Sequence, residues 1–122
     1  MFRLSINTCF SAAHSLTIQG VSEPVHGHDW QVKAVVEGPR LDDDGLLCDF
    51  HDLETLLAEI VGPFQTANLN ESEAFAESNP SAEVVARFIG VRLAAKLPPS
   101  VKPVEVSVTE APGCMATWMA DS

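Results

Sequence analysis

The sequence is poor in basic residues. Seven lysines and arginines stand against 17 aspartates and glutamates among 122 residues, which gives a formal net charge of −10. Nucleic acids and anionic membrane surfaces both require a cationic footprint on the protein that binds them. The charge balance therefore argues against both kinds of partner.

Long apolar runs and cysteines are also scarce. No stretch approaches the roughly 20 apolar residues of a membrane-spanning helix, and the first residues lack a signal-peptide layout. Cys9, Cys48 and Cys114 are an odd and widely separated set. Such a set fits free thiols in a reducing compartment, each expected to be a small buried side chain, better than a disulfide framework. These absences predict a cytoplasmic protein.

The length and apolar content fit one compact domain over residues 1–122. Hydrophobic residues make up 46% of the chain, which is enough for a single core. A chain of this size buries only about two-thirds of its surface on folding. Contacts between subunits could therefore add to its stability, and we expect a homo-oligomer.

Two periodicities predict an α+β fold. Alternating apolar and polar residues indicate strands, and apolar residues three and four apart indicate one-sided helices. The resulting order ββααββ favours an antiparallel sheet with both helices on one face. The expected elements are strands over 2–10 and 30–37, helices over 50–61 and 80–97, and strands over 104–108 and 115–119.

Caps and breakers set the ends of the two helices. Asp49 is expected to cap the first helix, and Gly62-Pro63 to end it. For the second helix, Asn79 is the expected cap and Pro80 the expected first-turn residue. Residues 64–78 between the helices have no clear period.

Three histidines have the parity of core-facing strand residues. His26 and His28 alternate with Gly27 ahead of the apolar series that begins at Trp30, and His14 continues the even series of the first strand. Three imidazoles on one face suit zinc with one open position. Turn residues or partly exposed packing remain the alternative for such a pattern. The fourth histidine, His51, is expected to be an ordinary solvated residue.

Glu110 stands where the last strands should place a core residue. It continues the even series of Val104, Val106 and Val108, and a buried carboxylate is costly unless it is paired. It either forms a salt bridge, lies beyond the end of the strand, or receives a ligand with two adjacent N–H donors.

Six spaced motifs together carry a family resemblance. They are FSAAH at 10–14, HGH at 26–28, GLLCDF at 45–50, LN at 69–70, NPSAE at 79–83 and EAPGC at 110–114. In order and spacing they resemble the 6-pyruvoyl tetrahydropterin synthase family, which includes 6-carboxytetrahydropterin synthase. The resemblance covers nearly the whole chain. It implies the T-fold, a ββααββ subunit whose sheets assemble into barrels, commonly as a hexamer of two trimers with sites between subunits.

The resemblance also implies roles for individual residues. His14, His26 and His28 match the zinc ligands, and Glu110 matches the residue that anchors the pterin ring. A second pair in the fifth motif would help to hold the pterin, namely Ser81 and Glu83. For Glu83 the alternative is a first-turn acid that interacts favourably with the helix dipole.

The chain departs from the family at the expected catalytic groups. The family's usual cysteine lies four residues before the first histidine of HGH, where this chain has Ser22, a far poorer base. The adjacent Glu23 resembles the glutamate that the type III branch carries near this place, although it could be only an exposed loop acid. The family's aspartate-histidine pair is missing, because residues 64–68 read FQTAN.

Two further departures concern phosphate. Family members commonly have arginine where this chain has Ser15, and often lysine where it has Glu54. Together with the net charge, these changes disfavour a triphosphate substrate unless a neighbouring subunit supplies cations. An unphosphorylated pterin is the more credible substrate.

The sequence thus predicts a zinc-dependent enzyme that acts on the side chain of a dihydroneopterin-type pterin, with Glu23 as its base. The type III branch, which yields 6-hydroxymethyl-dihydropterin, provides the pattern for this reaction. The alternative is a catalytically inactive homologue that binds zinc and a pterin. A third possibility is a structural zinc protein, which would need a fourth protein ligand such as a cysteine displaced by a bulge.

Overall fold

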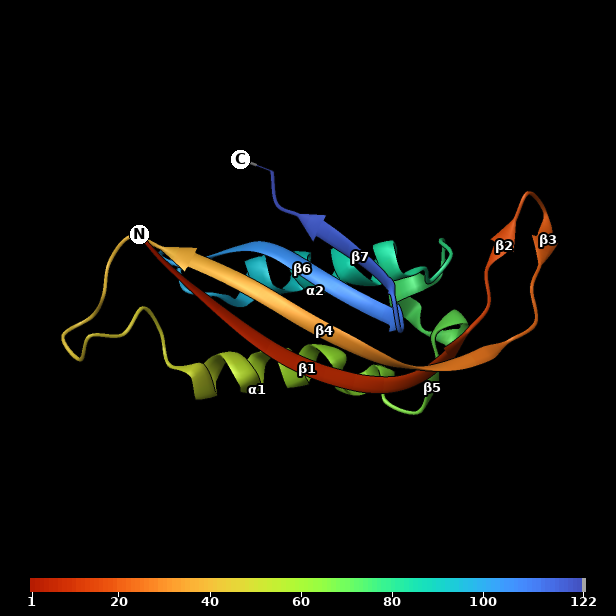
Figure 1. Ribbon diagram of the computed structural model, residues 1–122, viewed down its shortest axis with the longest axis horizontal. Helices are drawn as coiled ribbons and strands as arrows, with labels where there is room; N and C mark the ends of the chain where they lie inside the picture. Colours follow the sequence, from red (N-terminus) through yellow and green to blue (C-terminus); the bar gives the residue numbers. More distant parts are fainter. Residues whose placement is uncertain (122) are drawn as a thin grey trace.

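A twisted sheet with two helices packed on one face forms the protein (Figure 1). The computed structural model describes residues 1–121, and its five-stranded sheet has the order β5-β1-β4-β6-β7. Residues that alternate along the strands form one buried cluster with residues of both helices, while within residues 1–121 no helix covers the other face of the sheet. The predicted α+β architecture is confirmed. Its principal elements are β1 (Phe2–His14), β4 (His26–Gly38), α1 (Phe50–Val61), α2 (Ala82–Lys96), β6 (Lys102–Ala111) and β7 (Cys114–Met119).

The first two long strands extend further than predicted. β1 and β4 each have 13 residues and pair antiparallel along their whole length, from Phe2 opposite Gly38 to His14 opposite His26. The predicted strands ended at residue 10 and began at residue 30. The additional residues are small, polar or histidines, so they hid the apolar alternation although they keep its geometry.

The region between these strands and the region after α1 contain short elements that the sequence did not reveal. β2 (Thr17–Ile18) and β3 (Val21–Ser22) form a small hairpin, with Gln19 and Gly20 in its turn at φ of 53° and 81°. β5 (Ala67–Asn68) lies parallel to β1, so the sheet is mixed rather than purely antiparallel. Three 3-10 helices complete the segment that showed no period: η1 (Gly62–Phe64), η2 (Leu69–Glu71) and η3 (Glu73–Phe75).

The start of α2 differs from the prediction. Asp49 caps α1 as expected, since its side chain accepts a hydrogen bond from the His51 amide. At α2, however, the cap is Ser81, whose hydroxyl accepts from the Val84 amide, and the helix begins at Ala82. Asn79 cannot cap this helix because its side chain binds Thr17 instead. Pro80 consequently precedes the helix rather than starting it.

The helices and the sheet enclose a tightly packed core. Trp30, Leu57 and Val106 have no exposed surface. Gly90 of α2 lies so close to the ring of Trp118 in β7 that a Cβ atom there would clash with it. The absence of a side chain at this position allows α2 to approach the last strand.

The cysteines do not fit the expectation of small buried side chains. Cys9 and Cys114 are exposed and Cys48 is only partly buried, and all three are free thiols. Burial, followed by the nearby carboxylates of Asp52 and Asp49, raises the pKa of the Cys48 thiol. This thiol therefore stays protonated over a wider pH range than an exposed cysteine.

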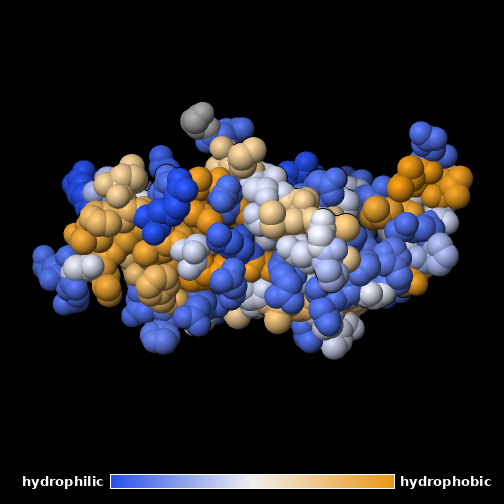
Figure 2. Space-filling view, viewed as in Figure 1, coloured by the Kyte–Doolittle hydropathy of each residue, from blue (hydrophilic) through white to orange (hydrophobic). Residues whose placement is uncertain are grey.

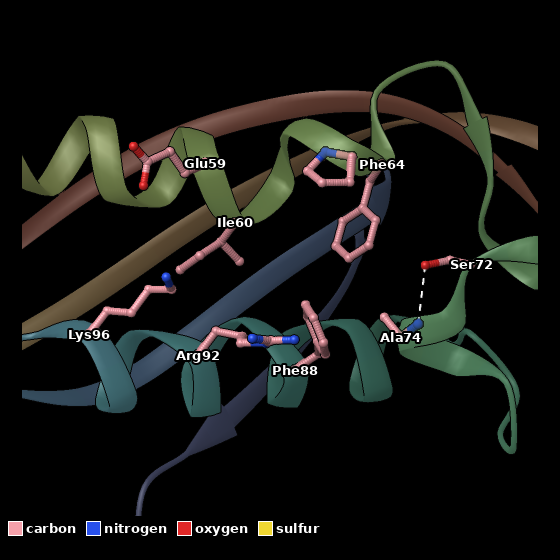
Figure 3. A pocket seen from close by; sticks show the side chains of 9 residues that line it. Glu59, Ile60, Phe64, Ser72, Ala74, Phe88, Arg92 and Lys96 are labelled. Atoms are coloured by element: carbon pink, nitrogen blue, oxygen red, sulfur yellow. Dashed lines mark hydrogen bonds between the residues drawn. The ribbon is translucent and has the colours of Figure 1, made fainter.

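Side chains of α1, of α2 and of the segment between these helices line a cleft (Figure 3). Its volume is about 320 Å³, and Arg92 of α2 stacks over the Phe88 ring, 5.1 Å from the ring centroid. The cleft lies on a different part of the fold from the histidines. Neither helix has the length and hydropathy needed to cross a membrane.

Candidate functional site

The three predicted histidines converge at one end of the β1–β4 pair. The strand register places His14 opposite His26 and Ala12 opposite His28, so all three rings lie on the helix-covered face. The ring centroids of these residues are 4.6 to 5.4 Å apart. One ligand atom from each histidine lies within 4.8 Å of the others, which is a possible metal-binding group.

Backbone carbonyls orient two of these rings. His14 Nδ1 lies 2.7 Å from the Pro80 carbonyl oxygen, and His26 Nδ1 lies 3.0 Å from the Pro24 carbonyl oxygen. A carbonyl oxygen can only accept a hydrogen bond, so each Nδ1 carries the proton and donates. In the neutral imidazole, each Nε2 then has a free lone pair. Metal-binding histidines are commonly oriented in this way.

Unpaired nitrogen atoms support a metal at this position. His14 is fully buried, and the Nε2 atoms of His14 and His28 are both shielded from solvent without a hydrogen-bond partner. Leaving such atoms unpaired is costly. The Trp30 ring packs edge-on against His14 and closes the inner side of the group. The residues present therefore fit a metal ion held by three neutral imidazoles.

Glu110 ends the inner series of β6 next to this group. Its Oε1 atom lies 2.9 Å from His14 Nε2, yet the two atoms do not have the alignment of a hydrogen bond. A carboxylate and an imidazole lone pair at this distance repel each other unless they share a proton or a cation. Glu110 is also partly exposed, with 27% of its side chain accessible. A cation at the histidines would relieve the repulsion and leave part of the carboxylate free for a ligand.

Glu23 also approaches the histidines, from the loop between β3 and β4. Its Oε1 accepts a hydrogen bond of 3.0 Å from the Leu16 amide and lies 3.8 Å from His26 Nε2. Its own amide donates to the Leu16 carbonyl at 2.9 Å. About a third of the side chain is exposed, 36%. Glu23 is thus a fixed carboxylate at the rim of the histidine group rather than a free loop acid.

Glu83 and Ser81 lie at the start of α2. Glu83 is in the first turn, and together with Glu110 it lines an open pocket of about 450 Å³ whose other walls include Cys114 and Thr117. The Ser81 hydroxyl already accepts a bond from the Val84 amide as the helix cap. The pocket brings Glu83 near the predicted ligand position, whereas the established contact of Ser81 is structural.

The residues that replace the family's usual catalytic groups make local contacts. Ser22 shares a hydrogen bond of 2.9 Å with Thr17 across the β2–β3 hairpin. Gln65 accepts from the Ser11 amide, and Thr66 has a φ of 57°, an unusual value for a β-branched residue. Among the described residues, the possible metal ligands that gather here are the three histidines, without a cysteine.

Three contributors to the site were not foreseen from the sequence. They are the Pro80 carbonyl and the side chains of Asn70 and Asn79, which bind the backbone of the segment after β1. Asn70 and Asn79 do occur within two of the spaced motifs. Their partners, however, are backbone groups 55 and 62 residues away in the chain, which no local pattern reveals.

The fold and the histidine group define an α+β protein with a candidate three-histidine metal centre. The family model described as 6-pyruvoyl tetrahydropterin synthase matches residues 3–121. Since this match covers nearly all of the sequence, the chain belongs to the 6-pyruvoyl tetrahydropterin synthase family, as the motifs predicted.

Individual relatives agree with this assignment. The putative 6-carboxy-5,6,7,8-tetrahydropterin synthase of Archaeoglobus fulgidus is 37% identical over 68 residues, 56% of this chain and 58% of that protein's length. The dihydroneopterin monophosphate aldolase of Pyrococcus furiosus is 32% identical over 108 residues, 88% of this chain and 89% of that protein.

A solved structure shares the fold. It is the Plasmodium vivax 6-pyruvoyltetrahydropterin synthase in a form that carries an alanine at a glutamate described as a catalytic residue. It superimposes with a TM-score of 0.83 at 18% identity and covers 99% of this chain and 98% of the other. At this identity the likeness establishes the fold alone.

The first prediction concerns the metal centre. His14→Ala, His26→Ala and His28→Ala should each abolish stoichiometric binding of a divalent metal, because two imidazoles are too few ligands to retain it. Metal content of the purified variants, measured by atomic emission, tests this. His51→Ala is the matched control, since this exposed histidine lies in α1 outside the group, and it should bind metal like the unmodified protein. Full metal content in all three variants would contradict the assignment.

Proposed function

We propose that this chain is a zinc-dependent enzyme that acts on the side chain of a dihydroneopterin-type pterin, with Glu23 as the base. The observation that carries the proposal is the Glu23 carboxylate, fixed 3.8 Å from His26 Nε2 at the rim of the histidine group. Zinc is the metal of choice because its common catalytic sites combine three protein ligands with one open position. His14, His26 and His28 would hold it.

The chemistry follows from the arrangement of these groups. Zinc bound there would supply Lewis acidity to a side-chain oxygen of the pterin. Glu23 would take the proton of a side-chain hydroxyl, which becomes a carbonyl as the adjacent carbon–carbon bond breaks. The electron pair of that bond passes to the carbon attached to the pterin ring, which then takes up a proton. The pterin fragment leaves with a shortened side chain.

Two findings about relatives support this reaction class. The Pyrococcus furiosus relative bears the name of an aldolase that acts on dihydroneopterin monophosphate, and aldolases break carbon–carbon bonds. In the Plasmodium vivax protein a glutamate is described as a catalytic residue. Both agree with a glutamate base that cleaves the side chain.

Glu110 is proposed to anchor the pterin ring. Its partly exposed carboxylate ends β6 beside the open pocket that Glu83 also lines. A carboxylate can accept two N–H bonds from the amino-pyrimidine edge of a pterin, the same fork that guanidinium groups present. Glu83 and Ser81 would contribute at the start of α2, where the cap leaves the Ser81 hydroxyl proton available.

The charge near the site bears on the phosphorylation state of the substrate. Glu23, Glu83 and Glu110 are all acidic, and the whole chain carries −10. A triphosphate would meet unfavourable potential, whereas an unphosphorylated or singly phosphorylated dihydroneopterin would meet less. Incubation of the zinc-loaded protein with dihydroneopterin, its monophosphate and its triphosphate, followed by identification of the products, separates these substrates.

A second candidate function is a zinc- and pterin-binding homologue without activity. Ser22 and the segment 64–68 provide no thiol and no aspartate-histidine pair, which favours this alternative. Tight pterin binding without any product in the incubation would support it over the enzyme.

We also propose that the chain forms a homo-oligomer, a barrel built as a hexamer of two trimers. In the described part of the chain, β7 has a neighbour on one side only and β5 covers β1 only at Ala12 and Ala13, so both sheet edges can pair. Figure 2 shows hydrophobic side chains at the end of the molecule that carries the β2–β3 hairpin. Ile18 and Val21 are 58% and 71% exposed there, which suits a contact with another copy near the site.

The assembly is tested by size-exclusion chromatography with light scattering. The expected mass is about six times the 13.1 kDa of the chain, because both open edges and the exposed hairpin residues would be covered. A monomer across the micromolar concentration range would contradict the proposal.

The anchoring role of Glu110 predicts a loss of pterin affinity. Glu110→Gln should weaken binding about tenfold to 100-fold, because an amide cannot accept two N–H bonds with charge assistance. Calorimetric titration with dihydroneopterin and a parallel zinc measurement test this. Unchanged pterin affinity would assign Glu110 to the fold, and loss of zinc would make it a metal ligand instead.

The catalytic role of Glu23 predicts a loss of turnover. Glu23→Gln should lower kcat by about 100-fold or more, a typical contribution of a general base, with zinc content and pterin affinity little changed. Ser22→Ala is the control beside it and should have a much smaller effect, since Ser22 binds Thr17. If Glu23→Gln keeps full activity, the binding homologue becomes the better description.

A further inference from the structure

Hydrogen bonds hold both sides of three consecutive residues that follow β1, namely Ser15, Leu16 and Thr17, the first residue of β2. On one side are two asparagine side chains. Asn70 accepts from the Ser15 amide and donates to the Ser15 carbonyl, both at 2.8 Å. Asn79 makes the same pair of bonds with Thr17, both at 2.9 Å. Each asparagine thus pairs with one backbone residue as a neighbouring strand would.

Glu23 occupies the other side of this segment. Leu16, between the two residues that the asparagines hold, turns its backbone groups the opposite way. Its amide donates to Glu23 Oε1 at 3.0 Å, and its carbonyl accepts from the Glu23 amide at 2.9 Å. All backbone hydrogen-bonding groups of the three residues are therefore used, four by asparagines and two by Glu23.

This arrangement links the carboxylate of Glu23 to distant parts of the chain. The Leu16 amide fixes the Glu23 oxygen that lies 3.8 Å from His26 Nε2. Leu16 is flanked on both sides by residues whose backbone groups the asparagines bind. Asn79 also directly precedes Pro80, whose carbonyl orients His14. One short stretch thus sets both a metal-facing ring and the segment that carries Glu23.

We propose that Asn70 and Asn79 are positioning residues that hold the Glu23 carboxylate beside the metal centre through the backbone of residues 15–17. This inference rests on the proposed function for its effect on turnover, because Glu23 acts there as the base. The primary amide is the side chain that suits this role: it offers one acceptor and two donors at the end of a short stem. Aspartate has no donor, and leucine has neither group.

Both asparagines are exposed, and this makes the proposal testable. Water can replace their hydrogen bonds when the side chains are removed, so the variants should fold. What water cannot replace is the fixed position of the backbone. The expected change is a misplaced carboxylate in a folded protein that retains its metal.

The first test compares turnover and substrate binding. Asn70→Ala and Asn79→Ala should each lower kcat about tenfold, and the double variant about 100-fold, because small displacements of a reacting group are costly. KM should change by less than about twofold, since Glu23 does not anchor the ring, and metal content should be retained. Asn7→Ala is the control, an exposed asparagine on the outer face of β1. Unchanged kcat in the double variant would overturn the proposal.

The second test asks whether the asparagines act through Glu23. In the Glu23→Gln background, the same asparagine substitutions should have little further effect on the residual turnover, because residues that act as a unit are not additive. Asn70→Asp and Asn79→Asp, which keep the shape but lose the donor, should resemble the alanine variants. An equal loss in both backgrounds would mean that the asparagines act independently of Glu23, against the proposal.

The third test needs no activity and no metal. Hydrogen exchange of the Leu16 and Glu23 amides, followed by NMR in the zinc-free protein, should be at least tenfold faster in the double asparagine variant than in Asn7→Ala. Equal protection of these amides in the two proteins would overturn the positioning role of Asn70 and Asn79. Faster exchange supports the positioning role of the asparagines. It does so even if Glu23→Gln leaves turnover intact, because that result contradicts only the proposal that Glu23 is the catalytic base.

Discussion

The burial of the His14 ring is the constraint on which the rest of this site depends. An imidazole without access to water needs a partner at each nitrogen. The Pro80 carbonyl satisfies Nδ1, so the chain before α2 must reach the end of β1. Nε2 turns toward the other two histidines and the Glu110 carboxylate. One buried ring thereby joins the end of the β1–β4 pair, the approach to α2 and the end of β6, three regions that are far apart in the sequence.

The charges around the His14 ring favour the binding of a cation at the histidine group. Glu23 and Glu110 both approach the histidine group, with carboxylate oxygens 3.8 Å from His26 Nε2 and 2.9 Å from His14 Nε2. A carboxylate and an imidazole lone pair at such distances repel each other, and partial burial weakens the screening by water. A dication bound at the histidines would offset this repulsion. In the proposed enzyme, a metal held there would be the local source of positive potential for a substrate oxygen, since Glu23 and Glu110 are both acidic.

Periodicity explains which parts could be predicted from the sequence. The histidine group followed from strand parity, because a side chain's face depends only on whether its position is odd or even. The same argument placed Glu110 in the inner series. The β2–β3 hairpin, β5 and the asparagine contacts could not be predicted, since they depend on bonds between side chains and distant backbone groups. The predicted start of α2 was wrong for the same reason. The Asn79 side chain binds the backbone of Thr17, and Ser81 caps the helix instead.

The fixed position of Glu23 bears on the choice between an enzyme and a binding protein. A carboxylate on a loop is normally less precisely held than one on a strand or helix. A protein that only binds a pterin needs an anchor for the ring, which Glu110 can provide, and a metal for the side chain. Binding alone does not require a second carboxylate at a fixed position. The Glu23 side-chain oxygen and the Glu23 backbone amide are nevertheless both hydrogen-bonded to Leu16 beside the histidines. A general base, by contrast, must stay within reach of one proton. The hydrogen bonds that fix Glu23 therefore favour the enzyme over the binding protein.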